Sequence, residues 1–182
     1  MISRSALALA ALGLVLSSSA AGAQEAPRQV LSINPIGAVF GVYMGEFERV
    51  VRPNTTAGVS ATYWNSDLQD GEDASAVASY LTVDAKLRYY PGASQLEGFS
   101  IGGSVGYTGL SGELTTVEGE AKGDVNTLGA GVELDYNWLL GARNQVMVGT
   151  GIGAKRLYVL GDDVEDVSLA YPTLRLVVGY AF

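Results

Sequence analysis

The amino-acid sequence predicts an all-β protein: an eight-stranded antiparallel up-and-down transmembrane β-barrel, preceded by a cleaved signal peptide. Three observations lead to this prediction. The chain opens on an apolar targeting segment, the rest divides into short segments of alternating polarity, and aromatic residues gather near the ends of those segments. No later stretch offers the roughly 18 to 20 consecutive apolar residues that a transmembrane helix needs.

The N-terminus has the parts of a signal peptide. Arg4 supplies the positive charge, residues 6–16 are an unbroken apolar run, and Ala21-Gly22-Ala23 matches an A-x-A cleavage site. The run is too short to cross ~30 Å of hydrocarbon at about 1.5 Å per residue. We therefore expect a signal peptide over residues 1–23, a short periplasmic leader over 24–29, and the barrel over 30–182.

Period-two alternation, bounded by turn residues, predicts eight strands, and no segment keeps helical periodicity. The predicted strands are 30–40, 42–51, 55–64, 79–90, 98–108, 126–139, 145–159 and 169–182.

The predicted connections alternate in length. Short turns at 52–54, 91–97 and 141–144 alternate with longer loops at 65–78, 109–125 and 160–168; a short first hairpin around Gly41 is the exception. This alternation is typical of outer-membrane barrels, and an even strand count would place both chain ends on the short-turn side, the periplasm.

The two faces of each strand differ in a way that favours apolar side chains outside. A soluble sandwich or barrel would also alternate, with its apolar face inward. Here the polar face carries a balanced set of charges, which a narrow barrel filled by side chains would need to pair. This predicted lumen network consists of Glu46, Glu48, Asp84, Lys86, Arg88, Glu133, Asp135, Lys155 and Arg175.

Glycines are predicted on the same inward face of neighbouring strands, where they would leave room for long side chains from the opposite wall. They stand at positions 102, 106, 129, 131, 149, 151 and 153. Paired carboxylates such as Glu133 and Asp135, or Glu46 and Glu48, would share a face and could perform acid–base chemistry. A salt-bridge network that plugs the barrel is the favoured interpretation of the same residues.

Aromatic residues on the apolar face predict two belts, as expected where amphipathic rings meet lipid headgroups. One belt, at the short-turn end, comprises Tyr89, Phe99, Tyr136, Trp138, Tyr180 and Phe182. The other, at the long-loop end, comprises Tyr63, Tyr107 and Tyr158.

The last nine residues, 174–182, alternate in polarity and end in Tyr180-Ala181-Phe182. This ending resembles the C-terminal signature of outer-membrane barrels, and the whole predicted barrel resembles the small OmpA/OmpX-type proteins. The resemblance implies that Val178, Tyr180 and Phe182 are read by the barrel-assembly machinery. Unlike in OmpA, we expect no periplasmic peptidoglycan-binding domain after the predicted barrel, so anchoring to the cell wall is not implied.

Acidic loops are the strongest remaining feature. Twelve of the 19 acidic residues fall in the three long loops, against Lys122 as their one basic residue. A solvated rim is the favoured reading, and divalent-cation binding is the alternative, because hard carboxylates suit such ions. The weak metal candidates are Asp70, Glu72, Asp73, Asp162, Asp163, Glu165 and Asp166.

The chain has no histidine and no cysteine, which removes the commonest general base and all thiol chemistry. We expect no enzyme activity and no cofactor, and the acidic charge argues against nucleic-acid binding. The expected function is a structural or surface-interaction barrel with a largely filled lumen, in contact with outer-membrane lipid and lipopolysaccharide, through divalent cations where these bind. A narrow channel for small solutes and a soluble periplasmic ligand-binding barrel are the alternatives.

Overall fold

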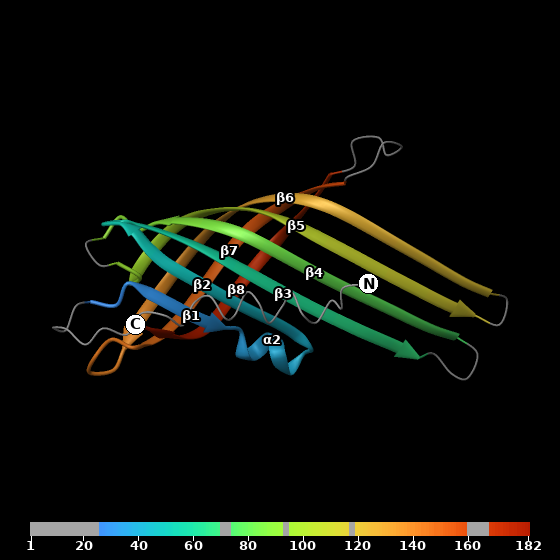
Figure 1. Ribbon diagram of the computed structural model, residues 1–182, viewed down its shortest axis with the longest axis horizontal. Coiled ribbons are helices and arrows are strands. Elements are labelled where there is room, and N and C mark those ends of the chain that lie inside the picture. Colours follow the sequence, from blue (N-terminus) through green and yellow to red (C-terminus); the bar gives the residue numbers. More distant parts are fainter. Residues whose placement is uncertain (1–25, 70–73, 93–94, 117–118, 160–167) are drawn as a thin grey trace, which may run out of the picture.

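The computed structural model describes residues 26–69, 74–92, 95–116, 119–159 and 168–182. Within these ranges the chain forms one closed antiparallel barrel in which each strand pairs with the next and β8 pairs with β1 (Figure 1). This confirms the predicted eight-stranded all-β barrel. Among the described residues, no helix has the length and apolarity that crossing a bilayer requires.

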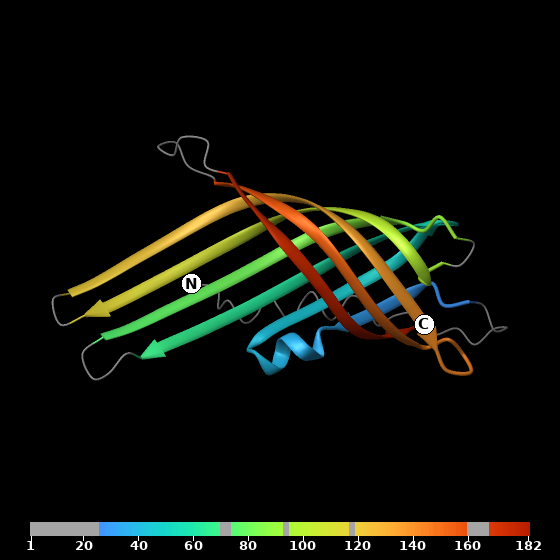
Figure 2. The ribbon, with the colours of Figure 1, turned by 180° about the vertical axis from the view of Figure 1, so that it is seen from behind.

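The eight strands run up and down in sequence order. Their bounds are β1 Gln29–Ile33, β2 Val42–Arg52, β3 Thr55–Gln69, β4 Ala74–Tyr89, β5 Gly98–Thr116, β6 Gly119–Leu140, β7 Val146–Val159 and β8 Ser168–Ala181. Gln29 and Phe182 exchange both backbone hydrogen bonds, at 2.9 Å each, and thereby close the barrel at its short-turn end. Seen from behind in Figure 2, the start of β1 and the end of β8 lie together at that end.

The first predicted strand, 30–40, is wrong in its second half. Strand β1 ends at Ile33, and a short helix, α2 (Pro35–Val39), follows it. Asn34 caps this helix by accepting a 2.8 Å hydrogen bond from the Gly37 amide, and Pro35 occupies the first turn, where its missing N–H costs nothing. The connection to β2 is consequently not the tight hairpin expected around Gly41.

Two of the three predicted long loops are mostly strand. β3 and β4 pair as far as Gln69 and Ser75, and β5 and β6 pair as far as Thr116 and Gly119. The segments 65–69, 74–78, 109–116 and 119–125 therefore belong to extended hairpins rather than to loops. Figure 1 shows these four strands reaching well beyond the rest of the barrel as a twisted four-stranded sheet.

The apolar face of the strands points outward, as predicted. Val83 on β4, Val132 on β6 and Leu174 on β8 are 47%, 66% and 67% exposed, whereas Arg88 and Arg175 on the opposite face are buried. A small apolar cluster fills the lumen at the short-turn end, and its members are Val30, Val50, Leu96, Met147, Val177 and Ala181. The interior is thus apolar only at this end and polar above it.

Aromatic side chains form two outward rows. The short-turn row has the six members that the sequence predicted, all exposed. The second row contains Tyr63, Tyr107 and Tyr158, as predicted, and also Tyr43, which pairs directly with Tyr63. Contrary to expectation, Tyr63 and Tyr107 do not mark strand ends, because β3 and β5 continue past them.

Candidate functional site: the charged lumen

The lumen holds a connected cluster of charged side chains centred on Arg88. The Arg88 guanidinium is 1% exposed and makes hydrogen bonds to four carboxylates from two opposite walls. Its Nε donates to Asp135 Oδ2 at 2.8 Å, and its Nη atoms donate to Glu46, Glu48 and Glu133 at 2.6 to 3.2 Å. Every N–H group of the guanidinium therefore has a carboxylate acceptor.

Two further bases complete the cluster. Lys86 lies 3.0 Å from both Glu46 Oε2 and Glu133 Oε1. Arg175 reaches across from β8, and its Nη2 donates to Glu46 Oε1 at 2.7 Å. Glu46 therefore receives three cationic partners, which explains how a carboxylate can be buried at 2% exposure.

A second, smaller cluster lies nearer the long-hairpin end. The Lys155 ammonium donates to Asp84 Oδ1 at 2.5 Å and to the Thr82 hydroxyl at 3.1 Å. Thr82 in turn shares a 2.8 Å hydrogen bond with Thr108. The nine residues that the sequence assigned to the lumen are thus brought together in two clusters, one around Arg88 and one around Lys155.

Several uncharged partners were not foreseen. Glu48 Oε1 accepts from Thr56 at 2.5 Å and from the Tyr90 hydroxyl at 2.8 Å. Asn137 donates to the Tyr90 oxygen at 3.0 Å and accepts from Arg175 at 2.9 Å. Their position on the polar face of their strands was the available signal, but neutral side chains carry no charge balance that would have singled them out.

Inward glycines make room for this network. A Cβ at Gly129 would meet the Lys155 side chain, one at Gly106 or Gly151 would overlap Asp84 or Asp135, and one at Gly149 would press on Asn137 and Arg175. The absent side chains lie beside the charged groups, so the glycines and the long bases occupy complementary positions. The inward placement predicted for these residues is confirmed.

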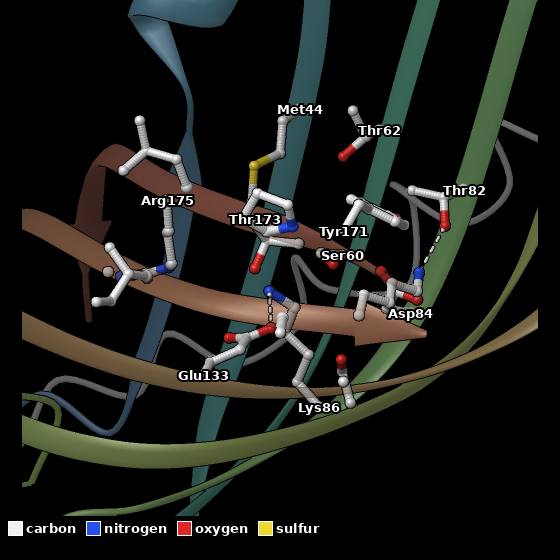
Figure 3. A pocket seen from close by; sticks show the side chains of 18 of the residues that line it. Met44, Ser60, Thr62, Thr82, Asp84, Lys86, Glu133, Tyr171, Thr173 and Arg175 are labelled. Carbon is white, nitrogen blue, oxygen red and sulfur yellow. Dashed lines mark hydrogen bonds and ion pairs between the residues drawn. The ribbon is translucent and has the colours of Figure 1, made fainter. Parts of the chain in front are cut away.

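A cavity of about 220 Å³ lies above the Arg88 cluster, bounded by both charged clusters (Figure 3). Hydroxyl groups line much of its wall, and Glu133 and Asp135 form part of its floor. The Asp135 Oδ1 atom is buried with no hydrogen-bond partner, and it lies 4.0 Å from Arg175. This carboxylate oxygen beside the cavity therefore has acceptor capacity that no hydrogen bond within the described residues uses.

The weak metal candidates, residues 70, 72, 73, 162, 163, 165 and 166, lie outside the described residues. No group of three potential metal ligands occurs in the part of the chain that the structure describes. Of the other acidic residues, Glu113 and Lys122 form a 2.9 Å ion pair across the exposed β5–β6 hairpin.

Comparison with solved structures identifies similar barrels. The crystal structure of Ail, the attachment invasion locus protein of Yersinia pestis, superposes with a TM-score of 0.60 over 87% of this chain and 100% of that chain, at 11% identity. Ail in complex with the heparin analogue sucrose octasulfate gives a TM-score of 0.55 over 85% and 94%, at 12% identity. At these identities the likeness establishes a shared fold.

Sequence comparison adds nothing to this assignment. No family model matches the chain, and no curated protein matches it.

Proposed function

We propose that this chain is a small outer-membrane β-barrel with a structural or surface-interaction role. The observation that carries the proposal is the inversion of polarity: exposed apolar side chains cover the outside, and nine charged side chains lie inside. A soluble barrel would lose free energy by such an arrangement, whereas a bilayer would cover the outer face. The two aromatic rows suit the headgroup regions on either side.

The extended hairpins supply the interaction surface in this proposal. Beyond the β2–β3 pair Val42–Trp64 and the β6–β7 pair Thr127–Val159, strands β3 to β6 continue without outer neighbours among the described residues. Within the part of the chain that the structure describes, the extension is a sheet with two free edges, and free edges can pair with an added strand. Ail, an attachment invasion locus protein with the same fold, supports a surface role for this barrel.

The decisive experiment is heat-modifiability combined with fractionation. The chain should be recovered from the outer-membrane fraction and should run faster on a gel when unboiled than when boiled. A chain released without detergent, with no mobility shift, would refute the membrane proposal. Surface exposure is tested separately, by protease treatment of intact cells with the β5–β6 hairpin as the expected cleavage site.

Export and assembly are part of the same proposal. Residues 1–23 would direct secretion and be removed, and Val178, Tyr180 and Phe182 would be read by the barrel-assembly machinery. These three side chains are exposed on the outer face of β8, and the Tyr180 and Phe182 rings stack with their centroids 6.1 Å apart. Replacing Phe182 by Ala should lower the amount assembled in cells more than it lowers folding of purified protein into vesicles.

The acidic rim is proposed as a solvated surface, and its alternative role is to bind lipopolysaccharide through divalent cations. Residues 65–78, 109–125 and 160–168 hold twelve carboxylates and one lysine, and a cation could bridge them to anionic lipid phosphates. Calorimetric titration of the folded protein with Ca²⁺ tests this step; an absence of saturable binding would leave the rim as a solvated surface. With no histidine or cysteine in the chain, we propose no catalytic role and no cofactor.

A further inference from the structure

The junction between the two ends of the barrel wall, where β8 meets β1 and helix α2, differs from the other junctions. We call the part beside the helix the α2–β8 seam. β1 pairs with β8 only from Val30–Ala181 to Ile33–Val178, whereas β7 pairs with β8 along almost its whole length. Beyond Val178, the side of β8 that faces away from β7 therefore has no strand partner among the described residues. Helix α2 occupies the adjacent position, between β2 and β8, as Figure 1 shows.

The direction of the backbone groups follows from the closing pair. Phe182 exchanges hydrogen bonds with Gln29 of β1, and Ala181 donates to Gln145 on the β7 side. Because these directions alternate along a strand, the even-numbered residues of β8 turn their backbone groups toward β1. At the seam these are the backbone groups of Ala170, Pro172, Leu174 and Leu176, and Pro172 has no N–H to leave unpaired.

Helix α2 covers this edge without bonding to it. Its backbone hydrogen bonds run within residues 34–41, and no hydrogen bond joins it to β8 in the described part of the chain. Every residue of α2 is apolar, and Ile36, Val39 and the following Phe40 are 52%, 81% and 74% exposed. Among the described residues, the α2–β8 seam is thus a junction without backbone hydrogen bonds, whereas each strand-to-strand junction of the barrel wall is a hydrogen-bonded ladder.

The seam lies beside the lumen cavity and at the height of the apolar belt. Asn34, Val42 and Met44, next to α2 or in β2, and Tyr171 and Thr173 of β8 line the cavity. Figure 3 shows Met44, Tyr171 and Thr173 around it. On the outer face β8 runs from Ser168, which pairs with Tyr158 of the second aromatic row, to Tyr180 of the short-turn row. Below the cavity, the Arg88 cluster closes the lumen.

The chemistry of the cavity selects the head group of a ligand. Lys86, Lys155 and Arg175 are already paired with carboxylates, whereas Asp135 Oδ1 is buried without a hydrogen-bond partner. The described lumen contains five acidic and four basic side chains, so one added positive charge would balance it. A hydrogen-bond-donating cation therefore suits the cavity and a carboxylate does not.

We propose that the α2–β8 seam is a lateral portal through which a single-chain alkyl amine binds, with its ammonium head in the lumen cavity and its alkyl tail in the bilayer. This inference rests on the proposed membrane location. It assigns to the cavity a ligand class and a route that leads into the lipid rather than through the barrel.

Tryptophan quenching by lipids brominated in their acyl chains tests the portal. Each variant carries W64F and W138F and one new tryptophan, and its heat-modifiability establishes that it has folded. L174W lies on the outer face, T173W lies on the cavity side of the seam, and S104W lies on the cavity side of the sealed β5 wall. We expect strong quenching of L174W, quenching of T173W several-fold above that of S104W, and little quenching of S104W.

The controls separate the two proposals. If L174W is not quenched, the barrel is not in the bilayer and the proposed function fails. If L174W is quenched but T173W behaves like S104W, the seam is sealed and the portal is refuted.

Titration with dodecylamine and with dodecanoate then tests the ligand class in vesicles. Dodecylamine should shift T173W emission saturably, whereas dodecanoate should leave it unchanged and neither should shift L174W. The W138F variant, in which Trp64 on the lumen face is the only tryptophan, repeats the titration with an unaltered cavity. Equal responses to the two amphiphiles, or no response from both T173W and Trp64, would overturn the proposal.

Discussion

Gly151 on β7 pairs directly with Asp135 on β6, and a Cβ at position 151 would overlap the Asp135 carboxylate. That carboxylate holds the Nε of Arg88, so one methyl group would displace the centre of the lumen cluster. We expect Gly151→Ala to lower the free energy of unfolding by about 1–3 kcal/mol, the usual cost of overpacking. Urea titration in lipid vesicles measures this change.

Gly45→Ala is the matched control. Gly45 lies in β2, and a Cβ there would meet no atom within 4 Å. Its substitution should change stability by less than about 0.5 kcal/mol. Equal effects of the two substitutions would show that the Gly151 contact does not constrain the lumen.

Removal of Arg88 should be among the most destabilising single changes in the barrel. Arg88→Met retains much of the side-chain volume but leaves Glu46, Glu48 and Asp135 without their shared cation in a buried site. Breaking one partner of a buried ion network typically costs about 3–5 kcal/mol. Arg88→Lys should fall between wild type and Arg88→Met, because an ammonium cannot reproduce the guanidinium fork.

The exposed Arg49, on the same barrel but outside the lumen, provides the comparison. Arg49→Met should change the unfolding free energy by less than about 0.5 kcal/mol. A loss at Arg88 no larger than that at Arg49 would mean that the lumen cluster contributes little net stability.

The lumen is closed by two layers in series. The Arg88 cluster forms one layer, and the apolar cluster that contains Leu96 and Met147 forms the other at the short-turn end. Wild-type protein in a planar bilayer should therefore show no large steady conductance. Arg88→Ala and Met147→Gly should each leave it closed, and the double variant should conduct. A large steady wild-type conductance would contradict the plugged lumen and favour the channel alternative.

Heparin binding should not extend to this chain, although a structure of Ail contains a heparin analogue. The chain has a net charge of −8, and twelve of its acidic residues fall in the segments predicted to form the rim. A sulfated polyanion would be repelled by such a rim. On immobilised heparin the folded protein should elute at or below physiological salt; retention well above it would point to a basic patch that the charge pattern does not reveal.

The sequence predicted the barrel well because period-two alternation is a property of each strand and needs no knowledge of its neighbours. The faces of Leu174 and Arg175 follow directly from it. Charge balance on the inward face then placed Arg88 among carboxylates, although only the register brings it to Asp135, 47 positions away. Pairing partners depend on the barrel's stagger, which alternation does not specify.

The predictions of strand and loop bounds were wrong where local chemistry competes with period-two alternation. The polarity of residues 30–40 alternates as in a strand. However, Asn34-Pro35 is also a helix N-cap followed by a proline at the first helical position, and these residues form the start of helix α2. The polar hairpin segments 65–69 and 109–116 lacked the apolar outer face that marks the wall, so their strands were assigned as loops. Pro172 was the overlooked indication of an open edge, since proline in a strand is confined to edges and bulges.

The Asn34 cap offers a direct way to change the α2–β8 seam. The Asn34 Oδ1 accepts from the Gly37 amide at 2.8 Å and fixes the first turn of α2, which makes no hydrogen bond to β8 among the described residues. Asn34→Ala removes this acceptor at a cost of roughly 0.5–2 kcal/mol, and Asn34→Asp retains it. Because the cap stabilises the closed position of α2, its loss should open the seam more often. In the T173W background, N34A should therefore increase quenching by brominated lipid, while N34D should not. Heat-modifiability should remain unchanged in both, since the strand ladders are untouched. If N34A and N34D give the same quenching, α2 does not control access to the cavity.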